Sequence, residues 1–456
     1  MRSHARSIFP IALLAWFGLC AGVLQLFDRY DWGRGLRRGL LLLCLSAIAF
    51  IPAVIALSSY RPKFHYQRFT SLGIAAAIVV LVGFGFHLYR GFHTLRLSSA
   101  QHQVFSDQGE DTVQAIRFLL RGVNPYGQRT MLDPVAYRDA RDELAAKPFC
   151  SQISASALSA AAEHFWVDPQ GRVAEMPDLF PVILDDPRCA DVRWRFSTLG
   201  YKYGPLLLYL YLPFVLTLGE AGIYAAHLLL FIVLSILVWK IGYRIANGDL
   251  FLASLPFILL YAPIFVRENT LESSAVDLGP TLFAFLAIWA LYGKPIARAQ
   301  LAGVTLGLSL ASKVAPAIFY LPLLSRRNPI LWVLFGLSTI AVILPFLIWD
   351  ANGFVDNWLI FGFARPGDTT SPMFFLDSAQ KLIISVLVVG MLGVAALYGH
   401  LKRWPIAVAI LFVAAAHLGG IGLSQVFHNN YFVWVLPVLA LSMLNTAVQL
   451  STESSD

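Results

Sequence analysis

Charged residues are scarce in this chain. They make up 13% of its 456 residues, whereas 57% are hydrophobic and the mean hydropathy is +0.66. A water-soluble domain needs far more polar surface, so the composition excludes that class and indicates a polytopic membrane protein. The apolar runs are unbroken rather than alternating, which argues against a membrane β-barrel. We therefore expect an all-α integral membrane fold.

Several signatures of soluble enzymes are also missing. No Gly-rich phosphate loop, zinc-type cluster of cysteine and histidine, or Ser-His-Asp arrangement stands out. A nucleotide-sugar enzyme on the cytoplasmic side usually carries Asp-x-Asp in a soluble domain, and this chain has neither. We see no internal repeat. We expect no cofactor, with a divalent metal left as an open alternative.

Cysteine is rare, with four residues in the whole chain. Cys20 and Cys44 lie inside apolar runs, where we expect inert thiols. Cys150 and Cys189 share one polar loop. If that loop is extracytoplasmic, these two residues can form a disulfide, and free thiols are an equal alternative.

Long apolar runs dominate what is present, many of them near the roughly 20 residues that an α-helix needs to cross a bilayer. They lie at 9–27, 39–58, 71–89, 203–218, 222–239, 250–266, 274–292, 298–312, 314–324, 330–348, 381–399, 404–422 and 430–447. The run 203–218 is short and holds two prolines, so we expect an interfacial or re-entrant helix there and about twelve true spans. No clear cleavage site follows the N-terminal run, which we interpret as an uncleaved first span.

Two long polar stretches, 90–202 and 349–378, interrupt the apolar runs. They suggest three parts. The first, 1–70, holds two extra spans. The second, 71–348, is a transmembrane module that includes the loop 90–202, and the third, 349–456, holds the second loop and the C-terminal spans.

The net charge of +7 does not indicate a nucleic-acid partner, because many basic residues sit in small groups at span ends. Four pairs fall on one side when the spans after 220 alternate: Lys240 and Arg244, Lys294 and Arg298, Arg326 and Arg327, and Lys402 and Arg403. If that side is the cytoplasm, both long polar stretches are extracytoplasmic. The basic residues between 29 and 38 are an exception to this rule.

The stretch FSDQGEDTVQAIRFLLRGVNPYG, residues 105–127, concentrates three carboxylates at the outer end of a predicted span. The apolar residues after Thr112 predict a short interfacial helix that ends at Gly122, followed by an Asn-Pro-Tyr-Gly turn. A solvated acidic loop with a capped helix is the plainer interpretation, which composition alone favours.

These residues resemble the first outer loop of GT-C membrane glycosyltransferases, closest to the mannosyl- and arabinosyltransferase-like members of glycosyltransferase family 87. That family places an acid outside an early span, then a juxtamembrane helix, then G-x-N-P-Y. Three further segments are similar to its motifs: YKYGPLLLYLYLPF, with Gly204 where a proline is usual; ASKVAPAIFYLPLL; and HNNYFVWVLPVL. The resemblance covers about two thirds of the chain, from about residue 71 onward. The aromatic residues usual after the acid are missing, and the insert 128–200 is long.

The resemblance implies a GT-C helical bundle with extracytoplasmic juxtamembrane helices. It implies an inverting, metal-independent transfer of a sugar from a polyprenyl-phosphate donor to a glycan or glycolipid acceptor, outside a bacterial inner membrane. Asp107 is the expected general base, with Asp111 and Glu110 as rivals. The other expected substrate-binding residues are Lys313, His428, Arg365, Asn124, Tyr126, Tyr203 and Glu268.

Each of these assignments has a simpler alternative. Lys313 can be a lysine that reaches from a span end to the interface, and His428 can belong to a polar turn. Glu268 and Glu272 are spaced to share one helix face and suit acceptor hydroxyls or a divalent metal, although Arg267 beside them favours a solvated loop. For the whole chain, the rival functions are a transporter or flippase of lipid-linked saccharide, and a different transferase that uses the same lipid donors.

Overall fold

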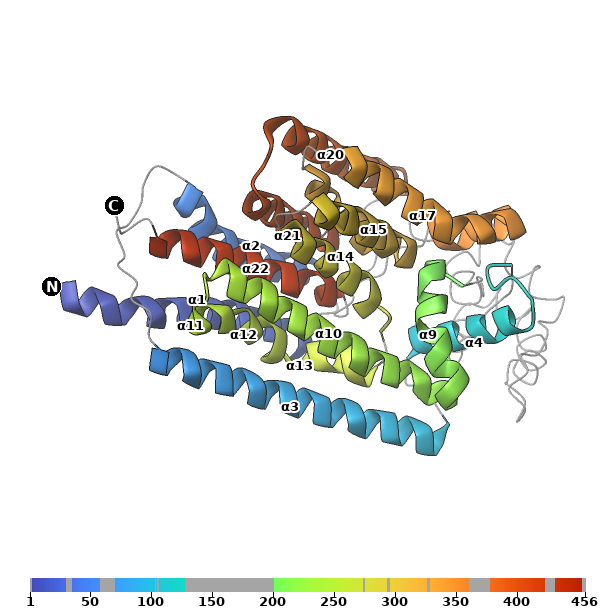
Figure 1. Cartoon of the computed structure of the whole chain (residues 1–456), viewed down its shortest axis with the longest axis horizontal. Coiled ribbons are helices and arrows are strands. Elements are labelled where there is room, and N and C mark those ends of the chain that lie inside the picture. The colour runs from blue at the N-terminus through green and yellow to red at the C-terminus, as the bar shows by residue number, and fades with distance from the viewer. Residues whose placement is uncertain are drawn as a thin grey trace, which may run out of the picture. The chain divides into compact units, whose positions relative to one another are not determined.

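The structure is a computed structural model (Figure 1). It describes residues 2–29, 35–57, 70–102, 104, 106–127, 201–273, 275–292, 296–325, 329–360, 378–422 and 431–452. All regular secondary structure within these ranges is helical, which confirms the all-α expectation. The described residues form two compact units. Unit 1 comprises Met1–Ser106, Gly204–Leu344 and Gly367–Asp456, and unit 2 comprises Asp107–Tyr203 and Pro345–Pro366.

Four described stretches are long and apolar enough to cross a membrane: Ser71–Gln101, Pro205–Ile245, Pro329–Trp349 and Phe432–Gln449. The expected count of about twelve spans is not confirmed, because the other apolar helices offer only 10 to 17 suitable residues each. Proline explains why one of the predicted spans is interrupted. The predicted span 250–266 is divided into α11 (Leu250–Ser254), α12 (Pro256–Tyr261) and α13 (Ile264–Arg267) at Pro256 and Pro263.

The stretch Pro205–Ile245 is two helices rather than one. The helix α9 (Pro205–Leu218) ends at a 3-10 turn, η2 (Gly219–Ala221), and α10 (Gly222–Ile245) follows in a different direction (Figure 1). Gly219 has a φ of +60°, which favours glycine at this corner. With 14 residues, α9 is shorter than a span requires, so α10 alone has the length to cross.

Unit 1 is organised around α10 and α22 (Phe432–Thr452). In α22, 83% of the apolar window is buried inside the protein, against 11% for α3 (Thr70–Gln101). The helix α3 runs antiparallel to α10, since Gly73 packs against Leu250 just after α10 while Gly91 packs against Leu228 near its start. The antiparallel pair agrees with the alternation of spans predicted from the basic residues.

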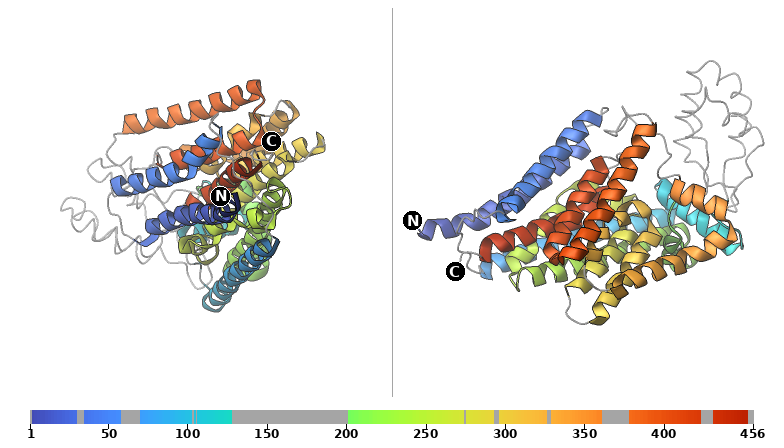
Figure 2. Two further views of the ribbon diagram at one scale, coloured as in Figure 1. Left: turned by 90° about the vertical axis from the view of Figure 1, so that its left-hand side faces the viewer. Right: turned by 90° about the horizontal axis from the view of Figure 1, so that it is seen from above.

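The remaining long helices of unit 1 surround this centre. They include α1 (Arg2–Arg29), α2 (Gly35–Leu57), α14 (Leu278–Leu291), α15 (Ile296–Ser312), α20 (Ser378–Lys402) and α21 (Ile406–Gly422). Short elements α16 (Val314–Ile318) and η4 (Leu321–Ser325) follow α15. Figure 2 shows α1 and α2 lying side by side, and α2 also packs on α22.

A close approach of small residues joins α15 to α17 (Pro329–Trp349). Gly303 and Gly307 form a G-x-x-x-G pair, and a Cβ added at Gly303 would lie 2.6 Å from the carbonyl oxygen of Leu331. The hydroxyl groups of Ser338 and Thr339 donate to the carbonyl oxygens of Val304 and Gly307, at 3.1 and 3.2 Å. This packing is typical of membrane helices, where small residues let backbones approach.

Candidate functional site

Unit 2 begins with the acidic helix that the sequence singled out. The helix α4 (Asp107–Leu120) places Val113, Ala115 and Ile116 in the interior, each at most 1% exposed. The N–H groups of Gly122 and Val123 donate to the carbonyls of Leu119 and Phe118, both at 3.0 Å. With a φ of +72° at Gly122, this is a Schellman cap, and it confirms the predicted end of the helix.

The Asn-Pro-Tyr-Gly turn after α4 is held by its own side chains. The Tyr126 N–H donates to Asn124 Oδ1 at 3.0 Å, and the Gly127 N–H donates to the Asn124 carbonyl at 3.2 Å. The Tyr126 hydroxyl donates to the carbonyl of Tyr203 at 2.6 Å. Three of the predicted substrate-binding residues, Asn124, Tyr126 and Tyr203, are therefore brought together.

A segment distant in sequence completes this cluster. The Asn357 side chain donates to the Tyr126 carbonyl at 2.9 Å, and the Tyr126 ring lies 4.7 Å from that of Phe354. Asp350 caps the short helix α18 (Ala351–Phe354) by accepting from the Gly353 N–H at 3.0 Å. Asp350 and Asn357 were missed in the sequence, where only a helix-capping pattern at Asp-Ala-Asn-Gly marks the place.

Among the acids of α4, the structure describes the surroundings of Asp111, whereas the side chain of Asp107 lies outside the described part of the chain. Asp107 is the first residue of the helix. Asp111 lies one turn further on, is 5% exposed, and pairs through Oδ2 with Lys202 Nζ at 2.8 Å. Lys202 was not anticipated from the sequence. A carboxylate held by a lysine in the interior is poorly placed to accept a proton from a substrate, so Asp111 is better suited to positioning than to general-base chemistry.

A buried tyrosine lies beside this ion pair. The hydroxyl groups of Tyr201 and Thr112 are 3.4 Å apart, and the Tyr201 ring lies 5.7 Å from that of Tyr126. Burial raises the pKa of Tyr201 well above its usual range. This phenol therefore stays protonated at neutral pH and can donate a hydrogen bond.

Four buried polar atoms of unit 2 have no hydrogen-bond partner among the residues that the structure describes. They are Gln114 Oε1, Asn124 Nδ2, Asn357 Oδ1 and Trp358 Nε1. Buried polar groups are normally paired, so unpaired ones point to water or a bound molecule. Two of them, on Asn124 and Asn357, belong to residues that bond directly to Tyr126. The side chains around the Asn-Pro-Tyr turn can therefore accept hydrogen bonds from hydroxyl groups and can also donate hydrogen bonds to them.

Unit 1 contains a second polar cluster, centred on Asp277. This aspartate is fully buried and accepts from Lys313 Nζ at 2.5 Å and from Trp434 Nε1 at 2.7 Å. Lys313 also lies over the Trp434 ring, 5.0 Å from its centre. Lys313 was predicted to stabilise a phosphate, but Asp277 balances its charge, which makes it a weaker phosphate ligand than the sequence suggested.

The predicted pair Glu268 and Glu272 lies in η3 (Glu268–Glu272), a π-helical turn rather than the expected loop. Glu272 Oε1 is 2.8 Å from Arg90 Nε and 3.0 Å from Arg267 Nε. Two arginines thus form ion pairs with the Glu272 carboxylate, which a metal ion would need as a ligand. Within the described residues, no group of three or more potential metal ligands occurs. Glu268 is nearly half exposed, and its Oε1 lies 3.9 Å from Arg267 Nη2.

Some predicted residues lie outside the described ranges. They are His428 and Arg365, together with Cys150 and Cys189. Their roles stay predictions.

Comparisons with other proteins identify no relative of this chain. No known protein family matches the chain, and neither the curated proteins nor the solved structures include a match. The resemblance to GT-C transferases therefore depends on the sequence motifs alone.

Proposed function

We propose that this protein is an extracytoplasmic membrane glycosyltransferase of the GT-C type that uses a polyprenyl-phosphate sugar. One observation carries the proposal. The acidic helix α4, the Asn-Pro-Tyr turn and the segment 350–358 assemble in one compact unit, whose described residues include four buried polar atoms without a hydrogen-bond partner. A sugar or acceptor offers several hydroxyl groups, which are the partners that such amide and indole groups bind.

In the proposed reaction, an acceptor hydroxyl oxygen attacks the anomeric carbon while the bond from that carbon to the phosphate oxygen breaks. Asp107 accepts the hydroxyl proton, and the polyprenyl phosphate leaves with the electron pair of the broken bond. The leaving group is already a stable anion, so no general acid is required. Donors or positive charge near the phosphate would stabilise it, a role that we assign to His428 and Arg365.

We choose Asp107 as the base because Asp111, one turn later on the same side of α4, already has a partner. Asp111 is buried and forms an ion pair with Lys202. This Asp111–Lys202 ion pair anchors the first turns of α4, at whose start Asp107 lies.

The test is transfer of a radiolabelled sugar from a panel of polyprenyl-phosphate donors by purified wild type, Asp107→Asn, Asp111→Asn and Glu110→Gln. We expect turnover by wild type and by Glu110→Gln, and a roughly 10²- to 10⁴-fold lower rate for Asp107→Asn with donor binding retained. Full activity of Asp107→Asn would assign the base elsewhere. Loss in Asp111→Asn without loss of stability would transfer the role to Asp111.

A second candidate function, transport or flipping of a lipid-linked saccharide, is favoured by one feature of unit 1. Ionisable residues inside membrane domains often mark transport pathways, and the pair of fully buried Asp277 and largely buried Lys313 lies among apolar helices. Binding of a donor without any turnover, together with its movement across reconstituted vesicles, would favour this function over transfer.

A further inference from the structure

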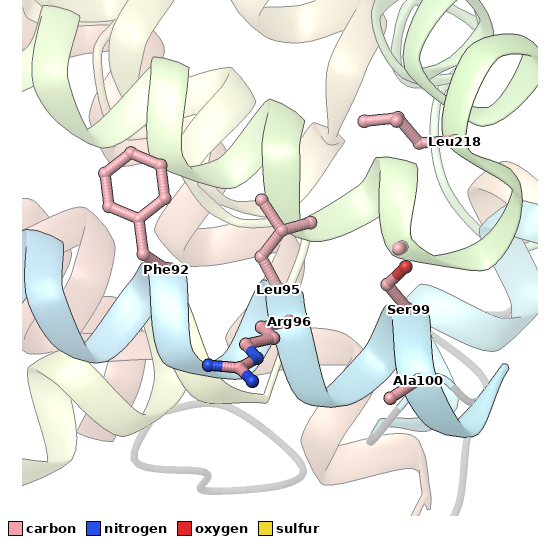
Figure 3. Close-up of a pocket in the computed structure, with 7 residues that line it drawn as sticks. Phe92, Leu95, Arg96, Ser99, Ala100 and Leu218 are labelled. Atoms are coloured by element: carbon pink, nitrogen blue, oxygen red, sulfur yellow. The ribbon is translucent and has the colours of Figure 1, made fainter.

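An apolar groove lies on unit 1 beside the last third of α3. Its volume is about 500 Å³, and it is lined by Phe92, Leu95, Arg96, Ser99, Ala100, Leu218 and Ala221 (Figure 3). Five of these seven residues are apolar. Figure 3 shows Phe92 and Leu95 projecting from α3 toward the neighbouring helices, the Ser99 hydroxyl on the side of Leu218, and Arg96 lying along α3.

The length of α3 places this groove at the edge of a bilayer. The helix has 32 residues and is therefore about 48 Å long, whereas the hydrocarbon core is roughly 30 Å thick. About twenty residues from Ser71 reach Arg90, where polar residues begin. Arg96 is a further six residues on, or about 9 Å, which is the depth of lipid headgroups.

The polar side chains of the groove match a phosphate. Arg96 is exposed and makes no ion pair with any residue that the structure describes, whereas Arg90 and Arg267 share Glu272. The exposed Ser99 adds a hydroxyl donor. Glu220, beside Ala221 in sequence, is not one of the lining residues. Among the residues that the structure describes, the groove thus combines one positive charge that has no ion-pair partner with an apolar wall.

We propose that this groove binds a glycerophospholipid with a single anionic phosphodiester, such as phosphatidylglycerol. Its phosphate contacts Arg96 and Ser99, and one acyl chain lies along Phe92, Leu95 and Leu218. One guanidinium matches one negative charge, and the apolar wall replaces the neighbouring lipid tails. The exposed Phe92, at 56%, belongs to the interfacial aromatic residues that lie at this depth. The inference is independent of sugar transfer.

The experiment is lipid titration of the detergent-purified full chain, followed by native mass spectrometry. Phosphatidylglycerol, phosphatidylcholine of the same acyl length and a polyprenyl monophosphate are compared. We expect phosphatidylglycerol to bind roughly fivefold more tightly than phosphatidylcholine, as expected for one basic residue near an anionic lipid. Arg96→Gln should abolish this preference, and Arg96→Lys should largely retain it. Ala100→Trp, at an exposed position, should weaken both phospholipids by filling the groove.

Arg244→Gln is the matched control, because Arg244 is also exposed but lies at the other end of α10. It should leave the preference unchanged. Equal binding of the two phospholipids, or a preference that survives Arg96→Gln, would overturn the proposal. Tighter binding of polyprenyl monophosphate than of phosphatidylglycerol, lost in Arg96→Gln, would also overturn it and would identify the occupant as a lipid carrier. Thermal unfolding of each variant verifies that it is folded.

Discussion

At the scale of single residues, the clearest feature is the fully buried Asp277, which holds both Lys313 and Trp434. A buried ion pair is not by itself strong support for stability, because desolvating two charges is costly. Removing one partner lowers the stability of the protein, since the other charge is then left in the interior without a countercharge. Each residue of the pair is therefore tolerated in the interior only while the other is present.

We predict that Asp277→Asn lowers the free energy of unfolding by about 3–5 kcal/mol, because Lys313 loses its countercharge in a buried place. Thermal unfolding of the purified protein in detergent measures this. The double variant Asp277→Leu with Lys313→Leu should recover most of the loss, since no charge is then left unpaired. A wild-type midpoint for Asp277→Asn would show that Lys313 finds water or another partner.

At the scale of elements, the start of α9 explains why one motif differs from the GT-C segment that it resembles. Gly204 stands where that segment usually has proline. Its N–H donates to the Ser312 carbonyl at 2.7 Å, and a Cβ at this position would lie 2.7 Å from the Ser312 carbonyl carbon. Proline has no N–H to donate, and any side chain would collide with the end of α15.

We predict that Gly204→Ala destabilises the protein by about 1–3 kcal/mol through this overlap, and that Gly204→Pro costs more because it also loses the hydrogen bond. Gly393→Ala in α20 is the control, because nothing lies within 4 Å of a Cβ added there. The control should keep its stability, or gain up to about 1 kcal/mol from helix propensity. Equal unfolding midpoints for Gly204→Ala and Gly393→Ala would contradict the steric argument.

At the scale of the whole molecule, the structure joins helix ends that the predicted alternation of spans assigns to one membrane face. The start of α14 at Asp277, the end of α15 at Lys313 and the start of α22 at Trp434 meet at one carboxylate. The antiparallel packing of α3 and α10 also agrees with the predicted alternation of spans. In the orientation predicted from the positive-inside rule, the basic residues at the opposite ends face the cytoplasm.

This topology predicts the reactivity of introduced cysteines. In a variant with its four native cysteines replaced by serine, Gln101→Cys should react with a membrane-impermeant maleimide in intact cells. Arg244→Cys should react only after permeabilisation, because α3 and α10 end on opposite faces. Labelling of both positions from outside would contradict the antiparallel crossing, and the opposite pattern would invert the orientation.

The sequence by itself determined the membrane class, the helical fold and the places of most helices. Hydropathy and turn signals are local properties, so α4, its Gly122 cap and the Asn-Pro-Tyr turn were visible in a stretch of about twenty residues. The number of spans was less well determined. Prolines and polar turns interrupt helices without lowering the average hydropathy, as at Pro256 and Pro263.

Only the tertiary structure decided which polar groups meet. Asp277 and Lys313 are 36 residues apart, and Asn357 bonds to Tyr126 across 231 residues. Nothing in a local pattern encodes such a pairing, because it depends on how helices pack. The same packing decided the surroundings of Asp111 in α4, since Lys202 engages it. A carboxylate in the sequence is a candidate base, but its partners in space decide whether it is available to accept a proton.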